Sequence, residues 1–196
     1  MLTRYAAIIL TSAFFLVAPS VAQAQNRWSL ELLPGVAFAT EDAGQAEIDF
    51  GVGADATIGY RVMPHLSVYG GWGWREFGAH SSFSRSDVDL AETGYLFGLR
   101  FEHPMGDDDA PELVVRLGGT YNHLEIEDGD GAIVSDSGHG LGFEVGAGVA
   151  FRLGDRWRVT PGVRFRSTER EFDELGVTVP APLRYMAIDL AFSRRF

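Results

Sequence analysis

The chain ends with the stretch Arg184-Tyr-Met-Ala-Ile-Asp-Leu-Ala-Phe-Ser-Arg-Arg-Phe196. From Phe196 back to Met186, every second residue is apolar except Arg194, and the residues between them are mostly small or polar. Because successive side chains of a β-strand point to opposite faces, this alternation predicts a strand with one apolar and one polar face.

Seven earlier segments show the same alternation. They are residues 28–38, 50–60, 66–74, 90–101, 113–123, 141–151 and 157–166. Together with the final stretch they predict an all-β fold, an eight-stranded antiparallel up-and-down barrel. The connections after the first, third, fifth and seventh strands are expected to be long, and the others short. The long ones are expected at 40–49, 78–89, 125–139 and 167–182.

The composition limits the classes of protein to which the chain can belong. Its 196 residues suffice for one domain, and the absence of cysteine excludes a disulfide or a thiolate metal site. All 16 basic residues are arginine, and the net charge is -11. Because nucleic-acid binding needs a basic face, this balance argues against nucleic acid as a partner.

The first 24 residues have the organisation of a secretory signal peptide. Arg4 is followed by an apolar run over residues 5–17 and then by the small-residue pattern Ala22-Gln-Ala24. The run is short for a membrane span, whereas a basic start, a short apolar core and an Ala-x-Ala site are typical of cleaved export signals. We therefore predict a signal peptide at 1–24, cleavage after Ala24, and an exported barrel at 25–196.

Alternation alone does not say which face of the barrel is inside, but three features favour a transmembrane barrel. The polar faces consist of Gly, Ala, Thr and isolated charges, as a narrow, filled interior requires. Long and short connections alternate, and aromatic residues lie near both ends of the strands, as at the two interfaces of a bilayer. The aromatic residues are Trp28, Tyr60, Phe101, Phe151, Trp157 and Phe196 at one rim and Phe38, Phe50, Trp74, Tyr121, Phe143 and Phe165 at the other.

On these features the chain resembles the small OmpA/OmpX-type outer-membrane β-barrels. The strings Tyr95-Leu-Phe-Gly-Leu-Arg100 and Gly142-Phe-Glu-Val-Gly-Ala-Gly148 are similar to strands of that family. The resemblance implies the outer membrane of a Gram-negative cell, contact with outer-membrane lipid and lipopolysaccharide, and insertion by the barrel-assembly machinery. It also implies an assembly signal on the last strand, from which Arg194 departs because this position is often aromatic. The residues of that signal are Ile188, Leu190, Phe192 and Phe196.

The parity of each position, that is, whether it belongs to the odd or the even set of residues along its strand, places a set of charged residues on the interior face. The set is Glu31, Asp55, Glu92, Arg100, Arg116, Glu144, Arg164, Arg166 and Asp189, with Arg152, Arg158 and Arg195 at the periplasmic rim. Such charges must pair, because an isolated buried charge is costly. The pairs form either a structural plug or an ion path gated by Arg/Glu exchange, and the small size of an eight-stranded barrel favours the plug. For Arg158 and Arg166 there is an alternative to an interior position: they could face solvent or lipid headgroups at the rims.

The remaining candidates for chemistry lie in the predicted outer loops. Acidic residues such as Glu125 and Asp136 either solvate the surface or bind divalent cations beside lipopolysaccharide. A lipid A-modifying enzyme needs a base next to its nucleophile, and only Ser137 and His139 have suitable spacing, because His123 is followed on its face by Glu125. We predict a non-enzymatic monomer, without metal or cofactor, that acts structurally or through acidic extracellular loops. A narrow channel or permease for ions or small solutes is the alternative, and a lipid A-modifying enzyme a weaker one.

Overall fold

The computed structural model describes residues 27–40, 46–81, 87–107, 110–128, 131–174 and 177–196. The predicted signal peptide at 1–24 lies outside these residues. Within them, no helix is long and apolar enough to cross a membrane.

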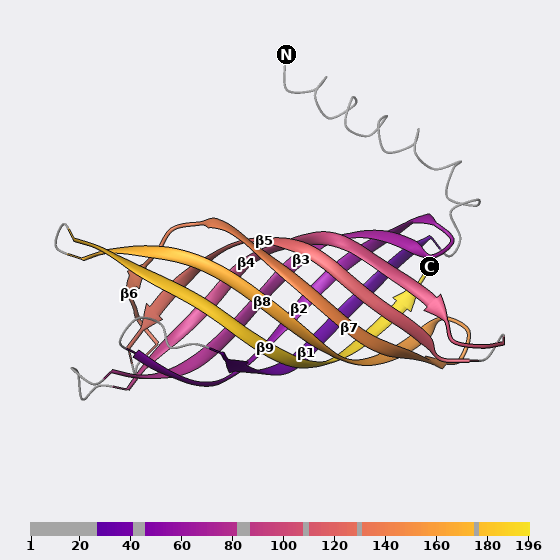
Figure 1. The fold of residues 1–196 in the computed structure, drawn as a ribbon, viewed down its shortest axis with the longest axis horizontal. Coiled ribbons are helices and arrows are strands. Elements are labelled where there is room, and N and C mark those ends of the chain that lie inside the picture. The colour runs from indigo at the N-terminus through magenta and orange to yellow at the C-terminus, as the bar shows by residue number, and fades with distance from the viewer. Residues whose placement is uncertain (1–26, 41–45, 82–86, 108–109, 129–130, 175–176) are drawn as a thin grey trace, which may run out of the picture.

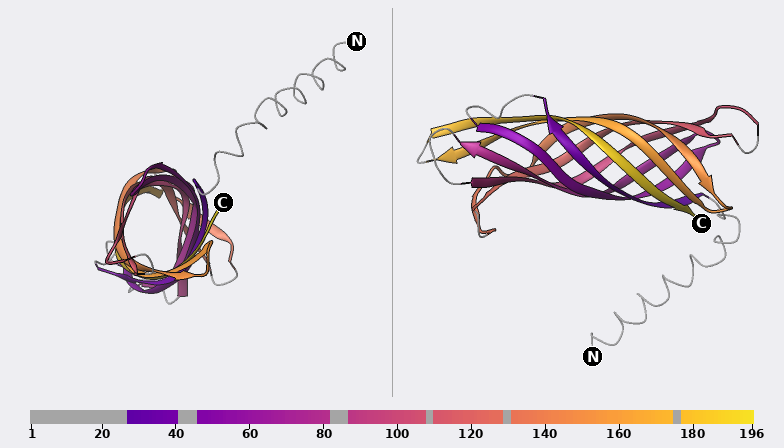
Figure 2. Two further views of the ribbon diagram at one scale, coloured as in Figure 1. Left: turned by 90° about the vertical axis from the view of Figure 1, so that its right-hand side faces the viewer. Right: turned by 90° about the horizontal axis from the view of Figure 1, so that it is seen from below.

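The polypeptide forms one antiparallel sheet that closes on itself (Figures 1 and 2). Its strands are β1 (Trp28–Ala39), β2 (Ala46–Met63), β3 (Leu66–Ser81), β4 (Asp87–Pro104), β5 (Glu112–Glu127), β6 (Ile133–Asp136), β7 (Gly140–Leu153), β8 (Trp157–Glu174) and β9 (Val177–Arg195). The short β6 pairs with the end of β5, and the other strands form the ring seen end-on in Figure 2, in which β9 returns to β1. The predicted eight-stranded up-and-down barrel is therefore confirmed.

The two ends of the barrel differ. At one end, here called the terminal rim, the chain ends at Phe196, whose amide donates a 2.9 Å hydrogen bond to the carbonyl of Trp28. Strands at this rim are joined through residues 64–65, 105–111 and 154–156. At the opposite end, here called the distal rim, several strands run far past the end of β1 (Figure 1).

The outer face of the wall is apolar around the barrel. Its exposed side chains include Leu30, Leu32, Ile58, Phe97, Leu117, Val145, Ile188 and Leu190. Aromatic side chains border this face, with ring centroids 4.9 Å apart for Trp28 and Tyr60 at the terminal rim and 5.9 Å apart for Phe143 and Phe165 farther along. So large an exposed apolar surface requires lipid contact, and closure of the sheet satisfies the backbone groups that lipid cannot.

Toward the distal rim the two faces of the strands exchange character. Along β8 the outward residues change from Val163 and Phe165 to the exposed Glu169, while the inward series ends at the buried Phe172. Phe172 belongs to an apolar cluster in the distal interior. The cluster comprises Ala37, Phe77, Leu90, Leu124, Phe172, Ala181, Leu183, Tyr185 and Ala187. This distal section is built like a soluble barrel, with its apolar face inward. The lipid-facing band therefore ends where this section begins.

The prediction of a long loop at 167–182 is wrong. β8 and β9 pair along this stretch, and only residues 175–176 lie between the two strands. The strands were predicted too short because their outward faces cease to be apolar, and because Pro180 and Pro182 are typical of loops. Proline is tolerated on an edge strand, and β9 is such an edge here, because its pairing with β1 extends only to Tyr185.

The other three predicted long loops are also shorter than expected, for the same reason. β2 begins at Ala46, β3 ends at Ser81, β4 begins at Asp87, β5 ends at Glu127 and β6 spans Ile133–Asp136. Acidic residues that the sequence assigned to loops, among them Glu125, Glu127, Glu169 and Glu171, therefore lie on the outer face of extended strands.

Candidate functional site: the interior charge network

The barrel interior holds ionisable side chains with almost no access to solvent. Among the described residues, seven arginines and seven carboxylates are buried. They are Arg75, Arg100, Arg116, Arg158, Arg164, Arg166 and Arg170, and Glu31, Asp55, Glu92, Glu102, Glu112, Glu144 and Asp189. Nearly all of them form ion pairs, which is the condition under which such groups can be kept out of water.

Two carboxylates gather arginines at the terminal rim. Glu112 accepts hydrogen bonds from Nη2 of Arg158 at 2.9 Å and from Nη2 of Arg152 at 3.1 Å. Glu102 accepts one from Nη2 of Arg195 at 2.7 Å. These charge-assisted bonds link strands across this end of the barrel.

Glu31 forms the next layer. One of its oxygens accepts a hydrogen bond from Nη1 of Arg100 and the other from Nη2 of Arg116. Arg100 also donates to the hydroxyl of Ser29 at 3.0 Å, and the guanidinium of Arg116 lies 5.0 Å from the ring centroid of Tyr69. The carboxylate is therefore held between two cations from the opposite wall.

Arg164 and Arg166 of β8 occupy the centre. Nη2 of Arg166 lies 3.1 Å from Oδ2 of Asp55 and 2.8 Å from Oε2 of Glu144, and both carboxylate residues are 0% exposed. Arg164 bonds to the same two carboxylates and donates from Nε to Oδ2 of Asp189 at 3.1 Å. Two cations thus share three acids, and no pair in this group is independent of the others.

Two further residues complete the central group. The hydroxyl of Tyr69 donates to Oε1 of Glu144 at 2.6 Å. Nη2 of Arg75 lies 3.4 Å from Oδ1 of Asp189, and its guanidinium lies 5.3 Å from the ring centroid of Tyr185. Both aromatic rings therefore pack against cations and extend the network toward the wall.

Glu92 forms the layer nearest the distal rim. It accepts a 2.5 Å hydrogen bond from the hydroxyl of Tyr185, one from the side-chain amide of Asn122, and lies 3.4 Å from Nη1 of Arg166. Arg170 donates from Nε to the carbonyl of Asn122 at 2.9 Å. Beyond this layer the interior becomes the apolar cluster.

Most of these bonds cross the lumen instead of following the strand ladder. The crossing contacts are Glu31–Arg100, Glu31–Arg116, Asp55–Arg164, Tyr69–Glu144, Arg75–Asp189 and Glu92–Arg166. They join β1 to β4 and β5, β2 to β8, β3 to β7 and β9, and β4 to β8, none of which are ladder neighbours. All eight wall strands contribute a side chain to the network.

Glycine makes room for the carboxylates. A Cβ at Gly73 would overlap Oδ1 of Asp55, and a Cβ at Gly35 would overlap Oδ1 of Asp189. In both cases the acid lies directly over the backbone of a neighbouring strand. The glycine-rich inner face is therefore a steric requirement of the ionic network.

Little space remains among these groups. A cavity of about 40 Å³ lies between Glu31 and Asp189, which is little more than the roughly 30 Å³ that one water molecule occupies in the liquid. At the terminal rim a recess of about 710 Å³ opens to solvent, lined in part by Arg61, Arg158 and Arg195. The network and the apolar cluster both lie between this recess and the distal rim.

All nine residues that parity assigned to the interior are buried in it and take part in these contacts. Arg158 and Arg166, for which the rims were an alternative, are buried as well. The sequence analysis missed further members of the network. They are the uncharged Tyr69, Asn122 and Tyr185, and the charged Arg75, Glu102, Glu112 and Arg170. The charged ones lie just past the predicted strand ends, where continued parity would have found them.

A closed eight-stranded barrel with an apolar exterior and an ion-paired interior defines the class of transmembrane β-barrels. Residues 7–196 match the family described as outer membrane protein beta-barrel domain. The chain belongs to this family, and its location is the outer membrane.

Solved structures with the same fold include neisserial surface protein A, which is 14% identical, with a TM-score of 0.58 over 86% of this chain and 97% of that one. The outer membrane protein AlkL is 18% identical, with a TM-score of 0.58 over 88% of this chain and 90% of that one. Outer membrane protein W of E. coli is 12% identical, with a TM-score of 0.53 over 88% of this chain and 98% of that one. At these identities the likeness concerns the fold alone. No curated protein matches the chain.

Removal of one central carboxylate should destabilise the barrel strongly. Asp55→Ala takes one acid from Arg164 and Arg166, and breaking a buried ion pair costs about 3–5 kcal/mol. The free energy of unfolding, measured by urea titration of the refolded barrel in lipid vesicles, should fall by about this amount.

The matched control is Glu169→Ala, which removes the exposed ion pair with Arg184, whose side chains are 73% and 36% exposed. That change should cost less than about 1 kcal/mol. Equal losses for the two variants would contradict a tightly coupled interior network.

Proposed function

We propose that the protein is a closed, non-conducting barrel of the outer membrane, with a structural or surface-contact role at its distal rim. The observation that supports this most strongly is the set of contacts that cross the lumen and involve all eight wall strands. A continuous ion path would have to separate several of these pairs at once. Each separation costs about 3–5 kcal/mol, so such openings would be rare.

A narrow channel for ions or small solutes is the second candidate. The recess of about 710 Å³ at the terminal rim favours it, because an ion entering there would meet a cluster of arginines. In this hypothesis Arg164 and Arg166 would exchange carboxylate partners as an ion passes. The apolar cluster beyond Glu92 opposes it, because an ion would also have to cross an apolar section.

The outward acids suggest the kind of surface that the distal rim presents. We assign this rim to the outside of the cell, where Glu169 and its acidic neighbours would meet the headgroups of lipopolysaccharide. The apolar face of the wall would contact outer-membrane lipid around a monomer.

Catalysis is not part of the proposal. The hydroxyl of Ser137 accepts a hydrogen bond from the amide of Leu124 at 2.8 Å and donates one to the carbonyl of Gly138 at 3.1 Å. The ring of His139 stacks on that of His123, with centroids 4.3 Å apart. The Ser/His pair suggested by spacing is therefore engaged elsewhere, which weighs against a lipid A-modifying enzyme.

Conductance of the refolded protein in planar bilayers separates the two candidates. The wild-type barrel should show no stable unit openings, because its lumen is closed by ion pairs. Stable unit openings in the wild type that disappear in Glu144→Ala or Arg164→Ala would replace the plug with a gated path.

We also propose that the final strand carries the assembly signal read by the barrel-assembly machinery. Ile188, Leu190, Phe192 and Phe196 all lie on the outer face of the wall and are exposed. Arg194 stands where an aromatic residue is often found, and its guanidinium lies 5.6 Å from the ring centroid of Trp157 and 5.0 Å from that of Phe196. Arg194 thus joins the aromatic girdle through cation–π contacts and preserves the apolar edge of the strand.

Loss of the terminal aromatic ring should impair assembly in cells. Phe196→Ala should lower the amount of folded barrel in the outer membrane several-fold, because it removes part of the signal. Phe101→Ala is the matched control, since Phe101 is an equally exposed aromatic residue of β4 that is distant from the chain end. Equal membrane levels of the two variants would count against a signal at the terminus.

A further inference from the structure

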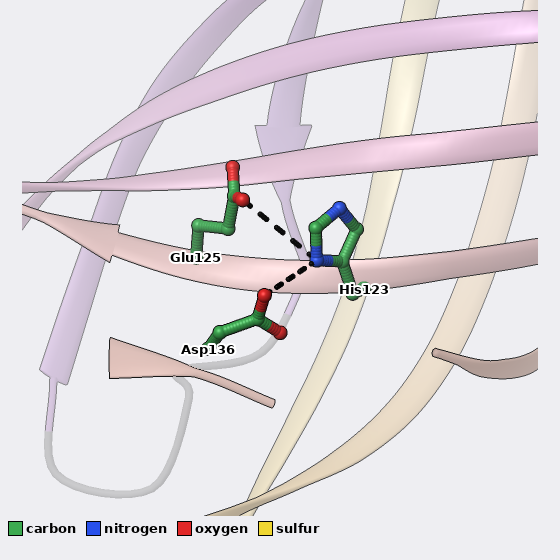
Figure 3. A group of neighbouring side chains, drawn as sticks. All are labelled: His123, Glu125 and Asp136. Atoms are coloured by element: carbon green, nitrogen blue, oxygen red, sulfur yellow. Dashed lines mark hydrogen bonds and ion pairs between the residues drawn. The ribbon is translucent and has the colours of Figure 1, made fainter. Parts of the chain in front are cut away.

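A mixed cluster of imidazole and carboxylate groups lies on the outer face of the barrel near the distal rim. His123 and Glu125 belong to β5, and Asp136 belongs to the short β6 that pairs with it (Figure 3). Nδ1 of His123 lies 3.1 Å from Oδ2 of Asp136 and 3.8 Å from Oε1 of Glu125. One ring nitrogen therefore faces two carboxylates from two strands.

These separations match the spacing of ligands around a small metal ion. Zn²⁺ binds imidazole nitrogen and carboxylate oxygen at about 2.0–2.2 Å, so neighbouring ligands of a tetrahedral site lie about 3.3–3.5 Å apart. The distances of 3.1 and 3.8 Å fall on either side of this value, and all three donor atoms lie within 4.8 Å of one another. Small side-chain adjustments would complete the site without moving the backbone.

The strand register brings the two carboxylates together in an unfavourable way. Glu125 and Asp136 are direct cross-strand partners in the β5–β6 ladder. Like charges in this position destabilise a sheet unless a cation lies between them. The same row continues through Ala91 of β4 to Glu76 of β3, which places a further acid on the same outer face.

The potential around the cluster is negative. Glu127 follows Glu125 on the same face of β5 and adds a further carboxylate beside the cluster. A cation approaching this part of the wall is attracted before it meets its ligands.

The side chain of Asp136 is oriented for metal binding. Oδ1 of Asp136 accepts a 2.7 Å hydrogen bond from the amide of Gly138, which turns Oδ2 toward His123. Contacts of this kind fix a ligand in position in known metal sites.

The chemistry of the donors selects the class of ion. Ca²⁺ and Mg²⁺ prefer oxygen ligands alone, whereas imidazole suits Zn²⁺, Cu²⁺ and Ni²⁺. The exposed His139, whose ring stacks on that of His123 at an interplanar angle of 13°, provides a second imidazole beside the site. A rotation about its side-chain bonds would let it act as a fourth ligand.

We propose that His123, Glu125 and Asp136 form a binding site for a divalent transition-metal ion of the Zn²⁺ type. On the outer face of the sheet, the ion would join β6 to β5 and neutralise the facing carboxylates. It would lie just outside the lipid-facing band, because His123 follows the exposed Tyr121 on the same face of β5. The site is independent of whether the lumen conducts.

Calorimetric titration of the refolded barrel with ZnCl₂, after removal of metal by a chelator, tests the proposal. One Zn²⁺ should bind per chain, and His123→Gln and Asp136→Asn should each weaken the affinity at least about tenfold. Glu76→Gln is the matched control, since it removes one negative charge from the same outer face but no proposed ligand. It should change the affinity by less than about threefold.

Thermal unfolding gives a second readout. Zn²⁺ should raise the unfolding temperature of the wild type and leave that of His123→Gln unchanged, because a ligand stabilises only the state that binds it. If His123→Gln does not fold, Asp136→Asn decides, because this side chain is 46% exposed on a short outer strand. Absence of Zn²⁺ binding by the wild type, or equal affinity in the ligand variants and Glu76→Gln, would overturn the proposal.

Discussion

Seven arginines and seven carboxylates of the described residues share the barrel interior, and they need charged or polar partners because none has ready access to water. This pairing constrains the rest of the structure. It joins strands that are not ladder neighbours, such as β2 with β8 through Asp55 and Arg164, so it depends on the sheet being closed. It also requires glycine beneath the carboxylates, because a side chain at Gly73 would displace Asp55. Closure and the glycine-rich inner face therefore follow from one electrostatic requirement.

The change of sidedness along the strands separates two environments on one wall. Near the terminal rim and in the middle of the barrel, the apolar face points outward and ionic groups fill the lumen. Toward the distal rim the acids face outward, and the apolar side chains of Phe77, Leu124 and Leu183 fill the lumen. A section with a packed apolar interior does not need lipid to be stable, so the strands can project beyond the membrane. The outward acids are thereby held on a paired sheet instead of on loops. This rigidity lets residues from β5 and β6 converge as a metal site requires.

Most of the fold and of the interior charges was predictable from the alternation of residues, and the predictions that were wrong have a common cause. Parity identified the strands, the outward apolar face and interior charges such as Glu144 and Arg164, because a lipid-facing strand has a strong period of two. It failed beyond the lipid-facing band, where the faces exchange and Pro180 imitates a loop. It also could not show which charges meet, since contacts across the lumen depend on barrel closure. The cluster at His123 was missed because Asp136 was placed in a loop, whereas it lies in a strand that pairs with β5.

The central claim is that the interior charges act as one coupled network that closes the lumen. A double-mutant cycle on Glu31 and Arg116, which meet across the lumen, tests it most directly. Unfolding free energies of Glu31→Ala, Arg116→Ala and the double variant, measured in lipid vesicles, should reveal a coupling energy of at least about 1.5 kcal/mol. Additivity of the two single changes to within about 0.5 kcal/mol would contradict the claim, because it would mean that these charges do not depend on each other in the membrane.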